Sequence, residues 1–417
     1  MTTLKFGFIP LTDCAPLVMA QEMGMFRRHG LEVELVKEVS WANIRDKVAT
    51  ATFDGAQMLA TMPIAASLGI AGPATPLVTA MVMSLNGNAI TVSNSLYAQM
   101  QTLVPETGRV RPCSAAAIQT VIRQQVQSGA PKLRLATVFP TSTHTYELRY
   151  WLAASGIDPD RDLDLIVIPP TQMVENLASG NIDGFCVGEP WNSLAINEGL
   201  GHSLITKYEL WNNSPEKVFG VSHEWAEKNP DDHMATIRAL VEAARWLDAD
   251  IANRHEAAAI LSRHEYLNTD IDVIKNSMTG TYQYNAGENP LAMPDFNVFY
   301  RYAANFPWLS HAVWFLSQMI RWGHIQQPLD VAAVASHIYR PDIYRQAVTS
   351  IGLKLPNVDY KEEGVHAHGW EWPDQELGLK MGADYFFDHA RFRASEIITY
   401  LDTFSIQHPR FDYHALK

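Results

Sequence analysis

Apolar runs alternate with segments of helical periodicity along the amino-terminal part of the chain. The runs predict strands at 5–9, 31–36, 53–59 and 77–85. The periodic segments between them predict helices at 16–28 and 41–52, and a third that begins at Met62. A strand–helix–strand order of this kind gives a parallel sheet with helices on its faces. We therefore expect the first part of the chain to fold as an α/β lobe.

The same alternation returns between residues 94 and 189. Its helices and strands are predicted at 115–126, 132–139, 145–154, 165–168 and 172–178. The next apolar run, Phe185–Val187, leads at once to Gly188 and Pro190, and proline cannot continue a strand ladder. We interpret 185–191 as a hinge strand beside a ligand cleft. The predicted lobes are 1–93 with 190–417, and 94–189, with the cleft between them.

After residue 233 the pattern becomes mainly helical, most clearly at 234–247, 256–262 and 311–323. The stretch 353–380 mixes glycine, proline and charged residues, which predicts a loop or an insertion. The expected architecture is two α/β lobes with a largely helical carboxyl-terminal part packed on the first. Ligands in such folds bind where strand carboxyl ends face helix amino ends, so we expect a site in the loops at those ends.

Composition narrows the class of protein. A chain of 417 residues is long enough for two or three domains, and a net charge of −13 argues against nucleic acid or an anionic membrane as a direct partner. No window holds the roughly 20 apolar residues that a membrane span needs. The scattered Cys14, Cys113 and Cys186 form neither a disulfide framework nor a zinc motif. The first ten residues lack a secretory signal, so we expect a cytoplasmic protein.

Four residues in the searched loops have side chains suited to a small anion. Trp41 begins a helix and offers a flat ring, and His144 precedes a helix and can donate to an oxyanion. Asn88 follows Gly87 after a strand, and Lys217 lies in the segment 214–220. Each also has an ordinary alternative: a core aromatic, a loop imidazole, a turn asparagine and a solvated loop lysine.

Further polar groups can line the same cleft, namely Thr12, Thr141, Thr143 and Glu189. Together the donors and the aromatic ring suit a small planar oxyanion. The sequence has no glycine-rich phosphate loop, no Gly-x-Ser-x-Gly elbow and no His-Glu-x-x-His motif. We therefore expect no catalysis, no metal and no cofactor. Cys14, at a helix start, could be a reactive thiol, but packing is the favoured interpretation.

Several stretches resemble the substrate-binding proteins of nitrate and bicarbonate ABC transporters. In the order of the chain they are Gly7–Leu17, Ser40-Trp41, Asp54–Ala56, Arg149–Ala154, Phe185–Trp191, Pro215–Gly220, Trp314–Leu316 and Ile320–Gly323. The resemblance extends over most of the chain. It implies the two-lobed periplasmic-binding-protein fold of type II, without enzyme activity.

The resemblance also implies a ligand. The nitrate pocket of that family falls on Trp41, His144 and Lys217, and its glutamine falls on Asn88, whose amide is shorter. Bicarbonate-binding relatives use an acidic residue and calcium where this chain has Lys217. A retained lysine therefore favours nitrate or nitrite without a metal.

A chain without an export signal is most similar to the cytoplasmic nitrate/nitrite sensors of the NasS type. That resemblance implies an RNA-binding antiterminator of the NasT type as partner, held by the ligand-free protein and released when ligand binds. The alternative is the substrate-binding component of a nitrate/nitrite ABC transporter. An enzyme of the thiamine-precursor-synthase type shares the two-lobed fold, but its cysteine-rich iron-binding segment is absent from the sequence.

Overall fold

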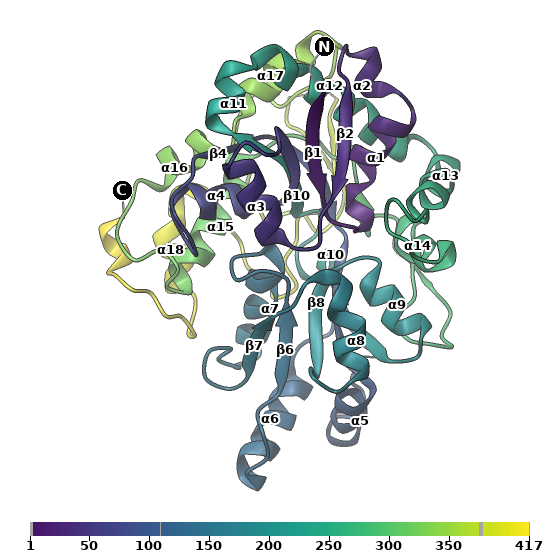
Figure 1. The fold of residues 1–417 in the computed structure, drawn as a ribbon. Coiled ribbons are helices and arrows are strands. Elements are labelled where there is room, and N and C mark those ends of the chain that lie inside the picture. Colours follow the sequence, from purple (N-terminus) through teal and green to yellow (C-terminus); the bar gives the residue numbers. More distant parts are fainter. Residues whose placement is uncertain (1–2, 109, 375–377, 417) are drawn as a thin grey trace.

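The computed structural model describes residues 3–108, 110–374 and 378–416. Two sheets, each covered by helices, lie one above the other in Figure 1, and the carboxyl-terminal part runs along one side of both. The predicted α/β class is therefore confirmed. None of the described helices is both long and apolar enough to cross a membrane.

The first sheet has six strands in the order β13-β4-β10-β3-β1-β2. Their bounds are β1 Leu4–Phe8, β2 Val33–Lys37, β3 Gly55–Leu59, β4 Leu77–Asn86, β10 Pro215–Ser222 and β13 Asn297–Val298. β1 pairs in parallel with β2 and β3, whereas β10 runs antiparallel between β3 and β4. All ten residues of β4 are buried, as expected for a sheet covered on both faces.

Helices cover this first sheet on both faces. They are α1 Ala15–Glu22, α2 Met25–Arg28, α3 Trp41–Ala49, α4 Met62–Ser67, α11 His223–Lys228, α12 Pro230–Ala249, α13 Ile251–Leu261, α14 Ile271–Met278, α16 Val331–Ile338 and α17 Pro341–Thr349. The predicted helix 16–28 is wrong in one respect, because it is interrupted. Gly24 adopts a φ of +66°, a left-handed conformation that ends α1 and starts α2 in a new direction.

The second sheet has five strands in the order β7-β6-β8-β5-β9. Their bounds are β5 Asn88–Ser93, β6 Arg134–Thr137, β7 Asp164–Val167, β8 Gly184–Gly188 and β9 Gly201–Thr206. Its helices are α5 Asn94–Leu103, α6 Ala116–Ser128, α7 Thr143–Ala154, α8 Met173–Ala178, α9 Trp191–Asn197 and α10 Lys207–Leu210. Ser142 caps α7 by accepting from the backbone N–H of Thr145, which fixes where the His144 helix begins.

The chain crosses between the sheets at places other than those predicted. β8 lies in the middle of the second sheet, and the chain stays there through α9 and β9. The crossings lie at Gly87, between β4 and β5, and between Thr206 and Pro215. The interpretation of 185–191 as a returning hinge strand is therefore wrong, and the second sheet extends beyond the predicted 94–189 at both ends. Gly87, at φ +90°, turns the chain from β4 into β5 within a single residue, and β5 is absent from the predicted strands.

The carboxyl-terminal part packs on both lobes instead of the first alone. Its helices α15 Leu309–Arg321 and α18 Ile397–Asp402 lie beside α7 and its neighbours (Figure 1). The Tyr150 hydroxyl of α7 donates to Asp388 at 3.1 Å, and the Tyr146 hydroxyl bonds His324 Nδ1 at 2.7 Å. Within its described residues the stretch 353–380 is mainly irregular, with only the short strands β14 Trp370–Glu371 and β15 Lys380–Met381, which confirms the loop prediction.

Candidate functional site

The four predicted ligand residues come together between the two sheets. Trp41 and Lys217 belong to the first lobe, and Asn88 and His144 to the second, and all four are buried. The Lys217 Nζ lies 5.4 Å from the centre of the Trp41 ring. The ring is held there because Ser40 caps α3 and so sets the direction in which the chain enters the helix.

Lys217 lies inside strand β10, so the alternative of a solvated loop lysine is wrong. Neighbouring residues of a strand normally point to opposite faces. Here the pairing of β10 with β4 shifts its register on either side of Lys217, which is a bulge. The irregularity lets both Glu216 and Lys217 reach the same buried cluster, where Lys217 Nζ donates to Glu216 Oε1 at 2.7 Å.

The Glu216 carboxylate is the centre of this cluster. Its Oε1 accepts from the Thr143 hydroxyl at 2.8 Å and lies 3.3 Å from His144 Nε2. Its Oε2 accepts from Asn88 Nδ2 at 3.0 Å and from Lys207 Nζ at 2.5 Å. One carboxylate thus connects the predicted residues of both lobes.

Two further carboxylates complete the ionic network. Lys207 Nζ, at the start of α10, also contacts Glu147 Oε1 at 2.5 Å and donates to the Pro215 carbonyl at 2.8 Å. Lys217 Nζ contacts Asp13 Oδ2 at 2.8 Å, and Gln57 Nε2 donates to Asp13 Oδ1 at 2.5 Å. Acidic and basic side chains therefore alternate along this network, which connects the two lobes.

Burial controls the protonation states in the cluster. Burial lowers the pKa of the His144 imidazole to about 3, so the ring is neutral at pH 7. Burial also raises the pKa of Asp13 and of Glu147 above the ordinary value for a carboxyl. It acts in the same direction on Glu216, but the neighbouring ammonium groups of Lys207 and Lys217 outweigh it and hold the Glu216 pKa well below its usual range.

The four predicted cleft neighbours divide into two groups. Thr143 belongs to the cluster, and the Thr141 hydroxyl is buried without a hydrogen bond to the described residues. Thr12 and Glu189 lie outside the ionic cluster and contact one another. The Thr12 backbone N–H donates to the Glu189 carbonyl at 2.8 Å, and the Glu189 carboxylate accepts from Tyr282 at 2.9 Å.

Five residues of the cluster escaped prediction: Asp13, Gln57, Glu147, Lys207 and Glu216. Two had a usable signal. Glu147 follows His144 by three residues, so a helix brings the two side chains to one face, and Glu216 is the immediate neighbour of Lys217. Lys207 had no such signal. Its ammonium reaches the other lobe only because β9, before it, pairs in the second sheet and β10, after it, pairs in the first.

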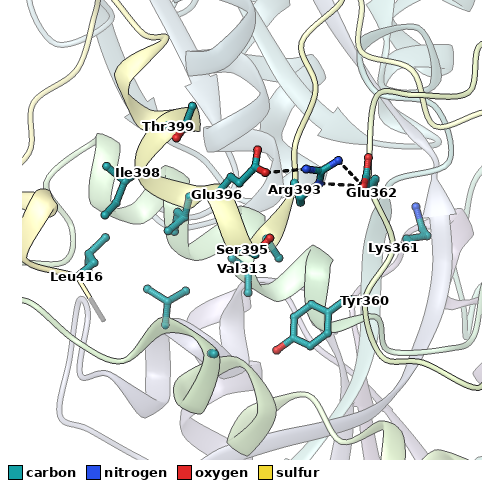
Figure 2. A pocket seen from close by; sticks show the side chains of 14 residues that line it. Val313, Tyr360, Lys361, Glu362, Arg393, Ser395, Glu396, Ile398, Thr399 and Leu416 are labelled. Atoms are coloured by element: carbon teal, nitrogen blue, oxygen red, sulfur yellow. Dashed lines mark hydrogen bonds and ion pairs between the residues drawn. The ribbon is translucent and has the colours of Figure 1, made fainter.

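A cavity of about 970 Å³ lies apart from this site, beside α15 and α18, and Val313, Tyr360 and Leu416 are among the residues that line it. Figure 2 shows the Arg393 guanidinium at one edge, between the carboxylates of Glu362 and Glu396. The cavity contains none of the predicted ligand residues. Both of its cationic groups already have carboxylate partners, Arg393 in Glu362 and Glu396 and Lys361 in Glu363, so the geometry does not make it a competing anion site.

The fold and the buried polar cluster define a two-lobed α/β binding protein. A family model described as the NMT1-like family matches residues 1–262. The chain is 35% identical over 409 residues to the nitrate/nitrite binding protein NrtA of Synechococcus elongatus, which covers 96% of this chain and 85% of that protein. The crystal structure of the periplasmic nitrate-binding protein NrtA from Synechocystis superposes with a TM-score of 0.83 at 30% identity, over 98% of this chain and 99% of that one.

The chain belongs to the NMT1-like family and, within it, to the NrtA/CmpA-like group of transporter substrate-binding proteins. It is also 43% identical over 351 residues to the nitrate import ATP-binding protein NrtC of Synechocystis. That match covers 84% of this chain but only 50% of NrtC, so the chain spans about half the length of that relative.

Proposed function

We propose that this chain binds nitrate or nitrite between its lobes, as the substrate-binding component of an ABC transporter. The observation that carries the proposal is the fully buried Lys217 ammonium, with the Trp41 ring and the His144 imidazole beside it. Nitrate is planar and monovalent, so one ammonium, a flat ring and neutral donors suit it. Trp41 Nε1 makes no hydrogen bond to the described residues, which leaves it free to donate to an oxyanion.

The relatives support a transport function over a regulatory one. The relatives include the nitrate import ATP-binding protein NrtC and the nitrate/nitrite binding protein NrtA. The sensor function, with its antiterminator partner, has no support from them, and the transporter alternative fits better. A cytoplasmic location stays a prediction.

Bicarbonate is the competing ligand. The chain is 38% identical over 364 residues to the bicarbonate transport ATP-binding protein CmpC of Synechocystis, so identity alone does not separate the two anions. The lysine favours nitrate or nitrite, because the family resemblance implies an acidic residue and calcium in bicarbonate-binding relatives where this chain has the buried Lys217. Two carboxylates of the chain itself contact this ammonium.

Calorimetric titration with nitrate, nitrite and bicarbonate, the last with and without calcium, tests the proposal. A charged hydrogen bond is worth about 1.5–3 kcal/mol, so Lys217→Met should weaken nitrate or nitrite binding by roughly 10- to 150-fold. His144→Gln, which removes no charge, should weaken it by less. Lys228→Met, at a lysine whose side chain is 69% exposed, is the matched control and should bind as the unaltered chain does.

Two results would contradict the proposal. One is calcium-dependent binding of bicarbonate with no binding of nitrate or nitrite. The other is equal nitrate affinity in the unaltered chain and in a Lys217→Met variant whose circular dichroism shows that it is folded.

A further inference from the structure

The ammonium that the anion needs is already occupied. Lys217 Nζ lies 2.8 Å from Asp13 Oδ2 and 2.7 Å from Glu216 Oε1, and all three side chains have no exposed surface. An anion bound to this ammonium would lie close to both carboxylates. Like charges at such distances disfavour one another's ionised forms, most of all where water is excluded.

The cluster as a whole has no spare positive charge. Two ammonium groups, Lys207 and Lys217, face the three carboxyl groups of Asp13, Glu147 and Glu216. His144 is neutral because it is buried. A monovalent anion added to this set increases an existing excess of negative charge unless one positive charge arrives with it.

The three carboxyls differ in how firmly the structure holds their negative charge. Glu216 has the most partners, with Thr143, Asn88 and two lysines donating to it or in contact with it. Asp13 has two, the ammonium of Lys217 and the amide of Gln57. If the anion takes over the Lys217 ammonium, Asp13 loses the one cation that contacts it among the described residues, whereas Glu216 keeps Lys207.

Among the described residues, no other group around Asp13 could replace the lost cation. The groups that face it are Cys14 on its own segment, Gln57 on β3, Gly188 at the end of β8, Glu216 and Lys217 on β10, and Lys207 on α10. Lys207 is held by Glu147 and Glu216. Burial already raises the pKa of Asp13, and the approach of an anion raises it further.

We propose that the site takes up one proton with each anion, and that Asp13 receives it. This inference rests on the proposed function, because it describes how that site accepts nitrate or nitrite. The proton comes from solvent and adds to Asp13 Oδ2. The neutral carboxyl then releases Lys217, whose ammonium turns to the anion. The charge of the anion and that of the proton cancel, so the net charge of the buried cluster does not change.

The consequence is a pH-dependent affinity. The bound state holds one more proton than the free state between the free and bound pKa values of Asp13. In that range the dissociation constant rises about tenfold for each unit of pH, and below it the affinity levels off. The affinity for nitrate or nitrite should therefore increase as pH falls, with no change in the charge of the ligand.

Calorimetry of nitrate or nitrite binding over a series of pH values, in buffers with different ionisation enthalpies, counts the protons directly. In the range where the affinity rises as pH falls, the unaltered chain should take up about one proton for each anion. Asp13→Asn should reduce the uptake to near zero and flatten the pH dependence of the affinity. Asp272→Asn, at a side chain that is 82% exposed, is the matched control and should retain the uptake.

The outcomes separate the two proposals. Tight anion binding without proton uptake by the unaltered chain overturns the inference and leaves the proposed function standing. Uptake that survives in Asp13→Asn but disappears in His144→Gln overturns the assignment to Asp13. No nitrate or nitrite binding at any pH overturns the proposed function itself. The measurement on the unaltered chain decides the first and third outcomes even if Asp13→Asn does not fold.

Discussion

Lys207 offers the sharpest test of the buried network, because its side chain is only 1% exposed and supports groups of both lobes. Its ammonium contacts the carboxylates of Glu147 and Glu216 at 2.5 Å each, and donates to the Pro215 carbonyl at 2.8 Å. Lys207→Met keeps most of the side-chain volume and removes the charge. Removing one partner of a buried ion pair costs about 3–5 kcal/mol, since the other charge is left uncompensated. We expect a loss of that size in the free energy of unfolding at pH 7.

The loss should depend on pH. Without its ammonium, the buried Glu147 binds a proton more readily in the folded chain than in the unfolded one. The folded state then holds more protons, so stability falls as pH rises, by up to about 1.4 kcal/mol per unit. Lys207→Met should therefore be less destabilised at pH 5 than at pH 8. A double variant with Glu147→Gln should recover about 1–3 kcal/mol at pH 7, because the uncompensated carboxylate is gone.

Urea unfolding followed by circular dichroism measures these differences, with Lys228→Met as the exposed control. The Lys228–Glu224 pair is exposed on both sides, so solvent screens it and Lys228→Met should leave the free energy of unfolding almost unchanged. A loss below about 1 kcal/mol in Lys207→Met, a typical value for a solvated pair, would refute the reasoning. So would strict additivity of Lys207→Met and Glu147→Gln, since groups in one network should couple.

Three further outcomes follow from other parts of the structure. Burial raises the pKa of Glu189 from 4.5 to about 7, a difference that destabilises the fold by roughly 3 kcal/mol as pH rises through this range. Glu189→Gln should remove that pH dependence in urea unfolding at pH 5 and pH 8, because an amide does not titrate. The hydrogen bond can be kept, since Tyr282 can accept from the new amide. Gly87→Ala should cost about 1–3 kcal/mol in the same assay, because φ is +90° and a Cβ would lie 2.3 Å from Asn297 Oδ1. Burial raises the pKa of the Cys14 thiol well above its ordinary value, so titration of the native protein with a thiol reagent should find it unreactive, and a fast reaction protected by ligand would revive the redox interpretation.

The elements that the sequence predicts well are those specified by local pattern. Trp41 and His144 were found because each stands at the start of a helix that follows a strand, behind a serine cap. The α/β class follows from the same alternation. These features depend on residues close together in the chain, so periodicity and capping contain the necessary information.

What the sequence does not predict depends on pairings between distant residues. Lys217 was placed in a loop, because a strand that starts at Pro215 and contains adjacent charges does not show the usual alternation. β5 was missed because only Gly87 separates it from β4. Lys207 gave no signal, since its partner Glu147 lies 60 residues earlier and the two meet only after the second sheet has formed.

The location of Lys217 limits how this site can bind any anion. A buried ammonium without a counter-charge is costly, so the empty protein must satisfy it, and Asp13 and Glu216 do so. The ligand therefore competes with carboxylates of the protein instead of with water. The affinity for the ligand is then set by the difference in free energy between two similar interactions. Protonation of an internal carboxylate weakens its interaction with the ammonium and so strengthens ligand binding. An ammonium at the surface would bind the same anion with less competition and much less selectivity.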